Sequence, residues 1–141
     1  MARDDALVVA GHAALLLLGV ALGVWGTFLV PVRLPGGIEG LAVAVAVVGN
    51  VAAARLGGFG FGTALAAAMP GIGWLITVMV LSAGLPGMSG HDQDVLLPGK
   101  LPPDPGIVVV GTGFLFAGAV AALAGVLWAS HRIRSAATPS A

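Results

Sequence analysis

The sequence has no cysteine, which excludes disulfide frameworks, thiolate metal sites and thiol nucleophiles together. It is also poor in charge: Asp, Glu, Lys and Arg make up only 9% of its 141 residues, against about 25% in an ordinary soluble domain. Six basic and six acidic residues cancel to a net charge of zero, so no positive excess indicates a nucleic-acid partner. A soluble protein with so few charges has too little polar surface. Its apolar side chains are therefore expected to face a lipid bilayer.

Long apolar runs replace the missing charge, and apolar residues make up 58% of the chain. Four runs approach the roughly 20 residues that a helix needs to cross a bilayer, at about residues 7–30, 40–56, 61–85 and 107–129. The first run is longer than the apolar part of a signal peptide, so we expect it to be retained. The runs do not alternate between apolar and polar residues, so they predict helices rather than a membrane barrel. Short connections favour antiparallel neighbours, so residues 1–134 are predicted to form one all-α membrane domain, a four-helix antiparallel transmembrane bundle.

The basic residues favour one orientation, because they concentrate on the cytoplasmic side of bacterial inner-membrane proteins. If the N-terminus is cytoplasmic, four basic residues lie inside and two, Arg33 and Lys100, lie outside. The four inside are Arg3, Arg55, Arg132 and Arg134. We therefore expect both termini in the cytoplasm, a disordered tail at 135–141 and an extracytoplasmic loop at 86–105.

Polar residues inside the spans are few, and they are the first candidates for function. His12 lies five residues into the first span and Asn50 lies five residues before Arg55. At about 1.5 Å per residue, both are expected roughly 8 Å below the same interface. His12 and Asn50 are therefore expected to face each other, with Arg55 and Thr63 close by. An interhelical hydrogen bond is the favoured interpretation, because a proton relay usually needs a carboxylate and no Asp or Glu lies within any span.

Small residues indicate how the helices pack. Gly19 and Gly23 have the GxxxG spacing that lets two membrane helices approach closely. Two interpretations remain open, packing within the chain and contact with another protein. Trp25 and Trp128 fall near the ends of their spans, as is typical of the aromatic belt at a membrane interface.

Pro70 interrupts the third span within the sequence MPGIGW. Proline removes a backbone donor and crowds the preceding turn, so a kink or local unwinding is predicted near residues 66–71. Breaks of this kind line binding sites in some transporters. A structural kink packed by Trp74 is the favoured alternative, since proline is common in membrane helices.

The loop at 86–105 holds five of the nine prolines and the polar residues His91, Asp92 and Asp94. Proline stiffens the chain, so we expect an extended, semi-rigid loop. A solvated polar segment is the favoured interpretation, and a docking surface for a partner is the alternative. A divalent cation needs more oxygen ligands than this loop offers, so no metal site is predicted.

Motifs for catalysis are absent from the sequence. The glycine run LGGFGFGT lacks the lysine of a phosphate-binding loop and follows no strand. We expect its GGFG portion to form a flexible turn between the second and third spans. No nucleophile elbow and no paired-histidine zinc motif occurs. The sequence therefore predicts neither an enzyme nor a bound cofactor.

Two short motifs carry a resemblance to a family. GTFLVP ends the first span, and DVLLP precedes the last span. With four spans in about 140 residues, the chain resembles small integral membrane proteins of actinobacteria that have no assigned function. The resemblance implies a bacterial inner-membrane location and no catalytic residues.

The expected function is that of a non-enzymatic accessory or scaffold subunit of a membrane or cell-envelope assembly. Abundant helix-packing surface and the scarcity of reactive groups favour a protein that binds the bilayer and a membrane-protein partner or a second copy of itself. The alternative is a small homo-oligomeric transporter or channel, with Pro70, His12 and Asn50 along its path.

A reporter enzyme that is active only outside the cytoplasm tests the predicted orientation. Fused after Ala141, the reporter is expected to be inactive, because the C-terminus is predicted to lie inside. Inserted after Gly90, the same reporter is expected to be active. The reverse pattern contradicts the predicted topology.

Overall fold

A computed structural model of the chain describes residues 2–32, 40–83 and 105–137. These residues form four helices, and no strand occurs among them. The helices are α1 (Ala2–Leu29), α2 (Leu41–Phe61), α3 (Ala64–Ala83) and α4 (Pro105–Ala137). All four are long and apolar enough to cross a membrane. The predicted all-α four-helix bundle is confirmed, and the protein is a multi-pass membrane protein.

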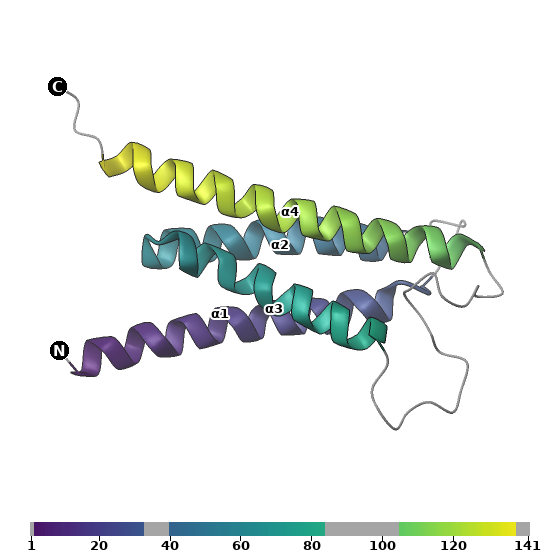
Figure 1. Cartoon of the computed structure of the whole chain (residues 1–141), viewed down its shortest axis with the longest axis horizontal. Coiled ribbons are helices and arrows are strands. Elements are labelled where there is room, and N and C mark those ends of the chain that lie inside the picture. Colours follow the sequence, from purple (N-terminus) through teal and green to yellow (C-terminus); the bar gives the residue numbers. More distant parts are fainter. Residues whose placement is uncertain (1, 33–39, 84–104, 138–141) are drawn as a thin grey trace.

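The helices alternate in direction along the bundle (Figure 1). α1 begins, α4 ends, and α2 turns into α3 at the same end, which we call the terminal end. The most extensive contacts join α2 to α4 and α1 to α3, whereas α1 and α4 scarcely touch. The closest partners are therefore helices that run in the same direction, not the antiparallel neighbours in the sequence.

Glycine brings α1 and α3 into backbone contact. A Cβ atom at Gly19 would overlap the carbonyl oxygen of Pro70, and one at Gly73 would overlap the carbonyl oxygen of Leu16. Each helix therefore places a glycine Cα against a carbonyl of the other, the geometry of a Cα–H···O contact. One turn further along α1, a Cβ at Gly23 would lie 2.8 Å from the Cβ of Thr77. Both glycines of the predicted GxxxG pair thus face α3 of the same chain.

Small residues also join α2 to α4. Glycines of one helix meet alanine methyl groups of the other at regular intervals, so the two backbones approach closely. The pairs are Ala46 with Gly118, Ala54 with Gly125, and Gly58 with Ala129. Both parallel helix pairs therefore rely on glycine for their close approach, against carbonyls in α1–α3 and against methyl groups in α2–α4.

Pro70 lies inside α3, which is helical without interruption from Ala64 to Ala83. The predicted local unwinding near residues 66–71 is therefore not observed. Proline has no N–H, so the carbonyl of Ala66, four residues earlier, loses its usual helical donor. That carbonyl oxygen faces the Cα of Gly57 on α2, where a Cβ atom would overlap it. Gly57 of the neighbouring helix α2 therefore lies against the carbonyl that lacks its usual donor.

The prediction of a turn at GGFG was wrong, because α2 continues through these residues to Phe61. Gly57 and Gly58 stay helical and face neighbouring helices, so their small size serves close packing. The turn comes at Gly62, which has a left-handed φ of 64° and donates its N–H to the carbonyl of Gly58 at 2.9 Å. Thr63 then caps α3, its Oγ1 accepting a hydrogen bond from the backbone N–H of Ala66 at 3.2 Å.

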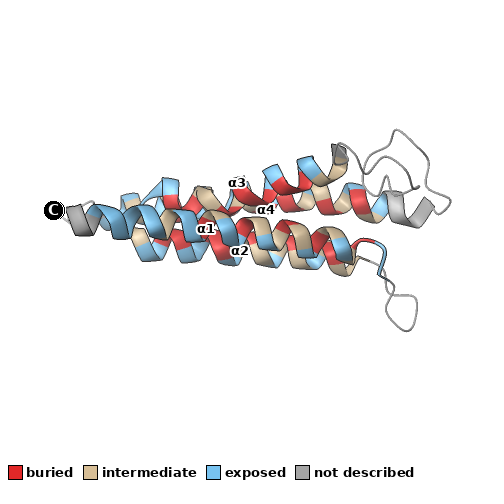
Figure 2. Ribbon diagram, turned by 90° about the horizontal axis from the view of Figure 1, so that it is seen from below, coloured by how far each residue is buried: buried red, intermediate tan, exposed pale blue. Residues whose placement is uncertain are grey.

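Large side chains fill the centre of the bundle. Trp74 and Phe114 are fully buried and meet edge to face, with ring centroids 5.4 Å apart. Gly118 lies against the Trp74 ring and Gly26 against the Phe114 ring, since a Cβ at either position would overlap that ring. Buried residues form narrow stripes that face the interior, while exposed faces look outward along every helix (Figure 2). The exposed faces are mostly apolar, as lipid contact requires.

Substitution of Gly19 tests the α1–α3 contact. Gly19→Ala is expected to lower the free energy of unfolding by about 1–3 kcal/mol, because the added methyl group displaces the Pro70 carbonyl. Gly60→Ala is the control, since nothing lies within 4 Å of a Cβ at that position; its effect should stay below about 1 kcal/mol. Unfolding by SDS in mixed micelles, followed by circular dichroism, measures both. Equal effects of the two variants contradict the close approach of α1 and α3.

Candidate functional site

His12 lies on the side of α1 that faces the end of α2. Its Nδ1–H donates to the carbonyl oxygen of Val8 at 2.8 Å, within its own helix. Its ring also packs against the Phe61 ring, with centroids 5.1 Å apart and planes tilted by 50°. The adjacent Gly11 leaves space for the same ring, because a Cβ there would overlap Phe61. His12 therefore anchors the C-terminal end of α2 to α1.

Asn50 lies near the middle of α2 and is 1% exposed. Its Nδ2 donates to the carbonyl of Ala46 at 2.9 Å, and its Oδ1 has no hydrogen-bond partner among the described residues. Phe61, which contacts His12, comes eleven positions later on α2. Eleven residues of helix span about 16 Å, so His12 and Asn50 do not face each other.

The expected His12–Asn50 pair was wrong because it placed the end of α2 at Arg55. The helix runs six residues further, to Phe61, so Asn50 lies deeper than expected relative to the terminal end. Thr63 is exposed in the α2–α3 turn, where it caps α3. Arg55 faces α4, so none of these residues joins Asn50 in a polar cluster.

Asn50 lies one helical turn from the level of Trp74. Gly118 lies against both the Trp74 ring and Ala46, which is one helical turn before Asn50. Trp74 Nε1, like Asn50 Oδ1, is buried without a hydrogen-bond partner in the described ranges. The two atoms are one donor and one acceptor, and neither side chain titrates. Neither Asn50 nor Trp74 can therefore act as an acid or a base.

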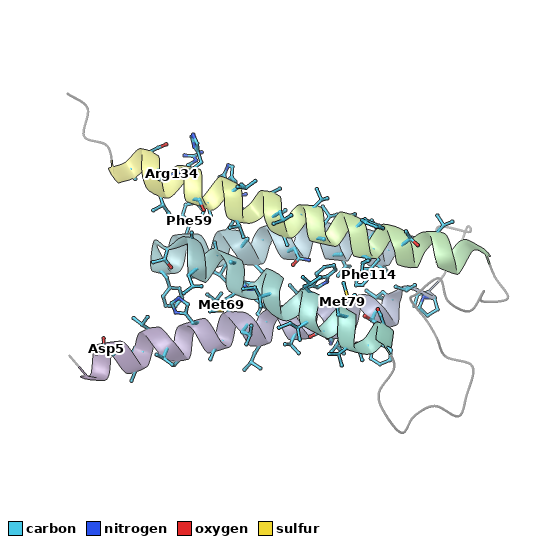
Figure 3. All side chains as sticks on the ribbon, in the orientation of Figure 1. Asp5, Phe59, Met69, Met79, Phe114 and Arg134 are labelled. Atoms are coloured by element: carbon cyan, nitrogen blue, oxygen red, sulfur yellow. The ribbon has the colours of Figure 1, made fainter. Side chains whose placement is uncertain are left out.

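A second cluster forms where α2 and α4 approach the terminal end. The Arg55 guanidinium carbon lies 4.6 Å from the centroid of the Trp128 ring, and that of Arg132 lies 5.3 Å from the same centroid. Phe59 meets Trp128 edge to face at 5.8 Å and lies 6.0 Å from Arg55. We call these four residues the Trp128 cluster. In Figure 3, Phe59 lies on the α2 ribbon and faces α4.

The contacts within the Trp128 cluster were not predicted from the sequence, in which Arg55, Trp128 and Arg132 were expected to lie separately near the membrane interface. A signal was present, because Arg55 and Phe59 are four positions apart, as are Trp128 and Arg132. Residues at that spacing share one face of a helix. The signal was lost when residues 57–60 were assigned to a turn, which removed Phe59 from α2.

The remaining candidates divide between the core and segments without a described structure. Pro70 is buried, and its carbonyl contacts Gly19. The predicted loop at 86–105, with His91, Asp92 and Asp94, lies outside the described residues apart from Pro105. The predicted tail at 135–141 is helical as far as Ala137, where α4 ends.

Comparisons with known proteins give no match: no protein-family model, curated protein or solved structure matches the chain. The described helices contain no group of three His, Cys, Asp or Glu side chains placed to hold a metal ion.

A double-mutant cycle tests the separation of His12 and Asn50. We expect His12→Ala and Asn50→Ala to add within about 0.5 kcal/mol, because the two sites share no contact. His12→Ala combined with Phe61→Ala is the control, and its coupling should exceed about 0.5 kcal/mol because the rings touch. Unfolding free energies in mixed micelles give both numbers. A larger coupling for the His12–Asn50 pair contradicts the arrangement described above.

Proposed function

We propose that the protein is a non-enzymatic accessory or scaffold subunit of a bacterial membrane or cell-envelope assembly. The observation that carries the proposal is that packed side chains and close backbone contacts fill the interior of the bundle. Glycine–carbonyl contacts and the Trp74–Phe114 pair fill the bundle, so the interior is occupied by packing rather than by reactive groups. A protein of this kind acts through its surface.

The outward faces of α1 and α4 support this proposal. α1 buries a narrow stripe of mostly small residues and exposes large apolar ones, such as Trp25 and Phe28. α4 exposes Phe116 and Leu127 in the same way. The two helices scarcely touch, so these faces look in different directions. Such an arrangement suits a subunit that lies between two neighbours in the bilayer.

The same proposal includes a location in the bacterial inner membrane and an orientation with both termini in the cytoplasm. The resemblance to small actinobacterial membrane proteins supports a bacterial inner membrane. The excess of arginine at the terminal end supports cytoplasmic termini.

A second candidate function is a small homo-oligomeric transporter or channel. Its support is the buried Asn50 Oδ1, a polar atom at mid-membrane depth without a partner in the described residues. Polar groups at such depth often mark transport paths. Trp74 and Phe114 block the centre of a single chain, so a path would have to run between copies.

Native extraction into polymer-bounded bilayer discs, followed by mass spectrometry, separates the two candidates. The scaffold proposal predicts a complex with a different membrane protein and no ion flux after reconstitution into liposomes. Ala13→Phe on α1 or Ala124→Phe on α4 should weaken that complex, because each adds a ring to an exposed face. Gly60→Phe, in open space near the C-terminal end of α2, is the control. Recovery of the bare monomer contradicts the scaffold proposal, and flux through a homo-oligomer supports the transporter.

A further inference from the structure

The geometry points to a binding site for the phosphate of an anionic phospholipid at the Trp128 cluster. This inference is independent of the scaffold proposal, because it concerns a lipid ligand rather than a protein partner. It rests on how Arg55 and Arg132 are held, on the charge around them and on their depth.

Both guanidinium groups are held on one aromatic ring. Their carbons lie 4.6 Å and 5.3 Å from the Trp128 centroid, so they are no further apart than the sum of these distances. A guanidinium that stacks on a ring uses its face for that contact, and its N–H donors point outward from its edge. Arg55 and Arg132 are both exposed, as is the Phe59 ring beside them. A ligand can therefore reach the donor edges from the lipid side.

No carboxylate among the described residues lies near the two charges to balance them. Asp and Glu are absent from α2, α3 and α4, and among the described residues they occur only in α1. α1 scarcely contacts α4. Figure 3 places Asp5, on α1, and Arg134, on α4, on opposite sides of the terminal end. Two neighbouring positive charges without a carboxylate are stabilised by an anion from outside the chain.

The depth of the cluster within the membrane indicates that a lipid supplies this anion. Arg55 lies six residues before the end of α2, about 9 Å below the α2–α3 turn. Its contact with Phe59, one turn nearer the turn, shows that its side chain extends towards the interface. A charge at that depth is costly without a partner. A phospholipid brings its phosphate to this level while its acyl chains cover the apolar faces of α2 and α4.

Arginine also matches the chemistry of the ligand. Its planar fork binds phosphate oxygens in pairs, and basic pockets between membrane helices bind anionic head groups. A zwitterionic lipid carries its own ammonium group, so it offers less net attraction. The site is therefore expected to prefer phosphatidylglycerol over phosphatidylcholine.

Native mass spectrometry of the full chain in detergent tests the site, with each lipid titrated separately. We expect phosphatidylglycerol to bind more tightly than phosphatidylcholine. Replacing both arginines, as Arg55→Gln with Arg132→Gln, should weaken phosphatidylglycerol binding about tenfold or more, since charged hydrogen bonds are lost. Arg55→Lys with Arg132→Lys should give a smaller loss, because charge remains but the planar fork does not. Circular dichroism checks that each variant is folded.

Arg3→Gln is the control, because it removes an arginine charge at the same end of the bundle but from α1. It should change phosphatidylglycerol binding less than twofold or so. The inference is overturned if both lipids bind equally, or if the control and the double glutamine variant lose binding alike. It is also overturned if free glycerol phosphate, at the lipid concentration, displaces the lipid, because a soluble phosphate would then be an equally good ligand.

Discussion

The structure depends above all on the contact between α1 and α3, where a glycine of each helix meets a carbonyl of the other. Lipid tails are as apolar as the side chains they cover, so helices gain little from the hydrophobic effect when they associate. Dispersion and Cα–H···O contacts replace it, and both require the backbones to be close. Gly19 against Pro70 and Gly73 against Leu16 provide that closeness. Trp74 follows Gly73, and Val78 lies one turn further along α3. Both side chains belong to the buried face of α3, which packs on Phe114 of α4.

The same close packing explains where the polar chemistry lies. Trp74 and Phe114 fill the centre of the bundle, and the Asn50 side chain forms its hydrogen bond within its own helix, to the carbonyl of Ala46. The charged side chains of the described helices belong to the terminal end, where Arg55 and Arg132 stack on Trp128. Binding to a partner or a lipid can therefore take place on the outward faces and at the interface.

The fold class follows from the sequence, because span length and backbone hydrogen bonding in lipid leave few alternatives. The pairing of the helices does not follow from the sequence. A GxxxG stripe such as Gly19/Gly23 indicates that a helix packs closely, but it does not indicate which helix is its partner. The turn was predicted at the wrong residues because glycine can either allow close helix packing or adopt a left-handed φ. Gly57 and Gly58 allow close packing, whereas Gly62 has the left-handed φ of the turn. Because α2 was expected to end too early, Asn50 was expected too close to the terminal end. For the same reason, Phe59 was not expected to lie on α2 beside Arg55.

The central claim is that the glycine faces of α1 and α3 are used within one chain, and NMR spectroscopy in lipid nanodiscs tests it most directly. A Cβ at Gly73 would lie 3.1 Å from the backbone nitrogen of Val20. A cross-peak is therefore expected between the Hα protons of Gly73 and the amide proton of Val20. The peak should persist when the labelled protein is diluted with an excess of unlabelled protein, because both protons belong to the same chain. Absence of the peak, or its appearance only between differently labelled copies, contradicts the claim.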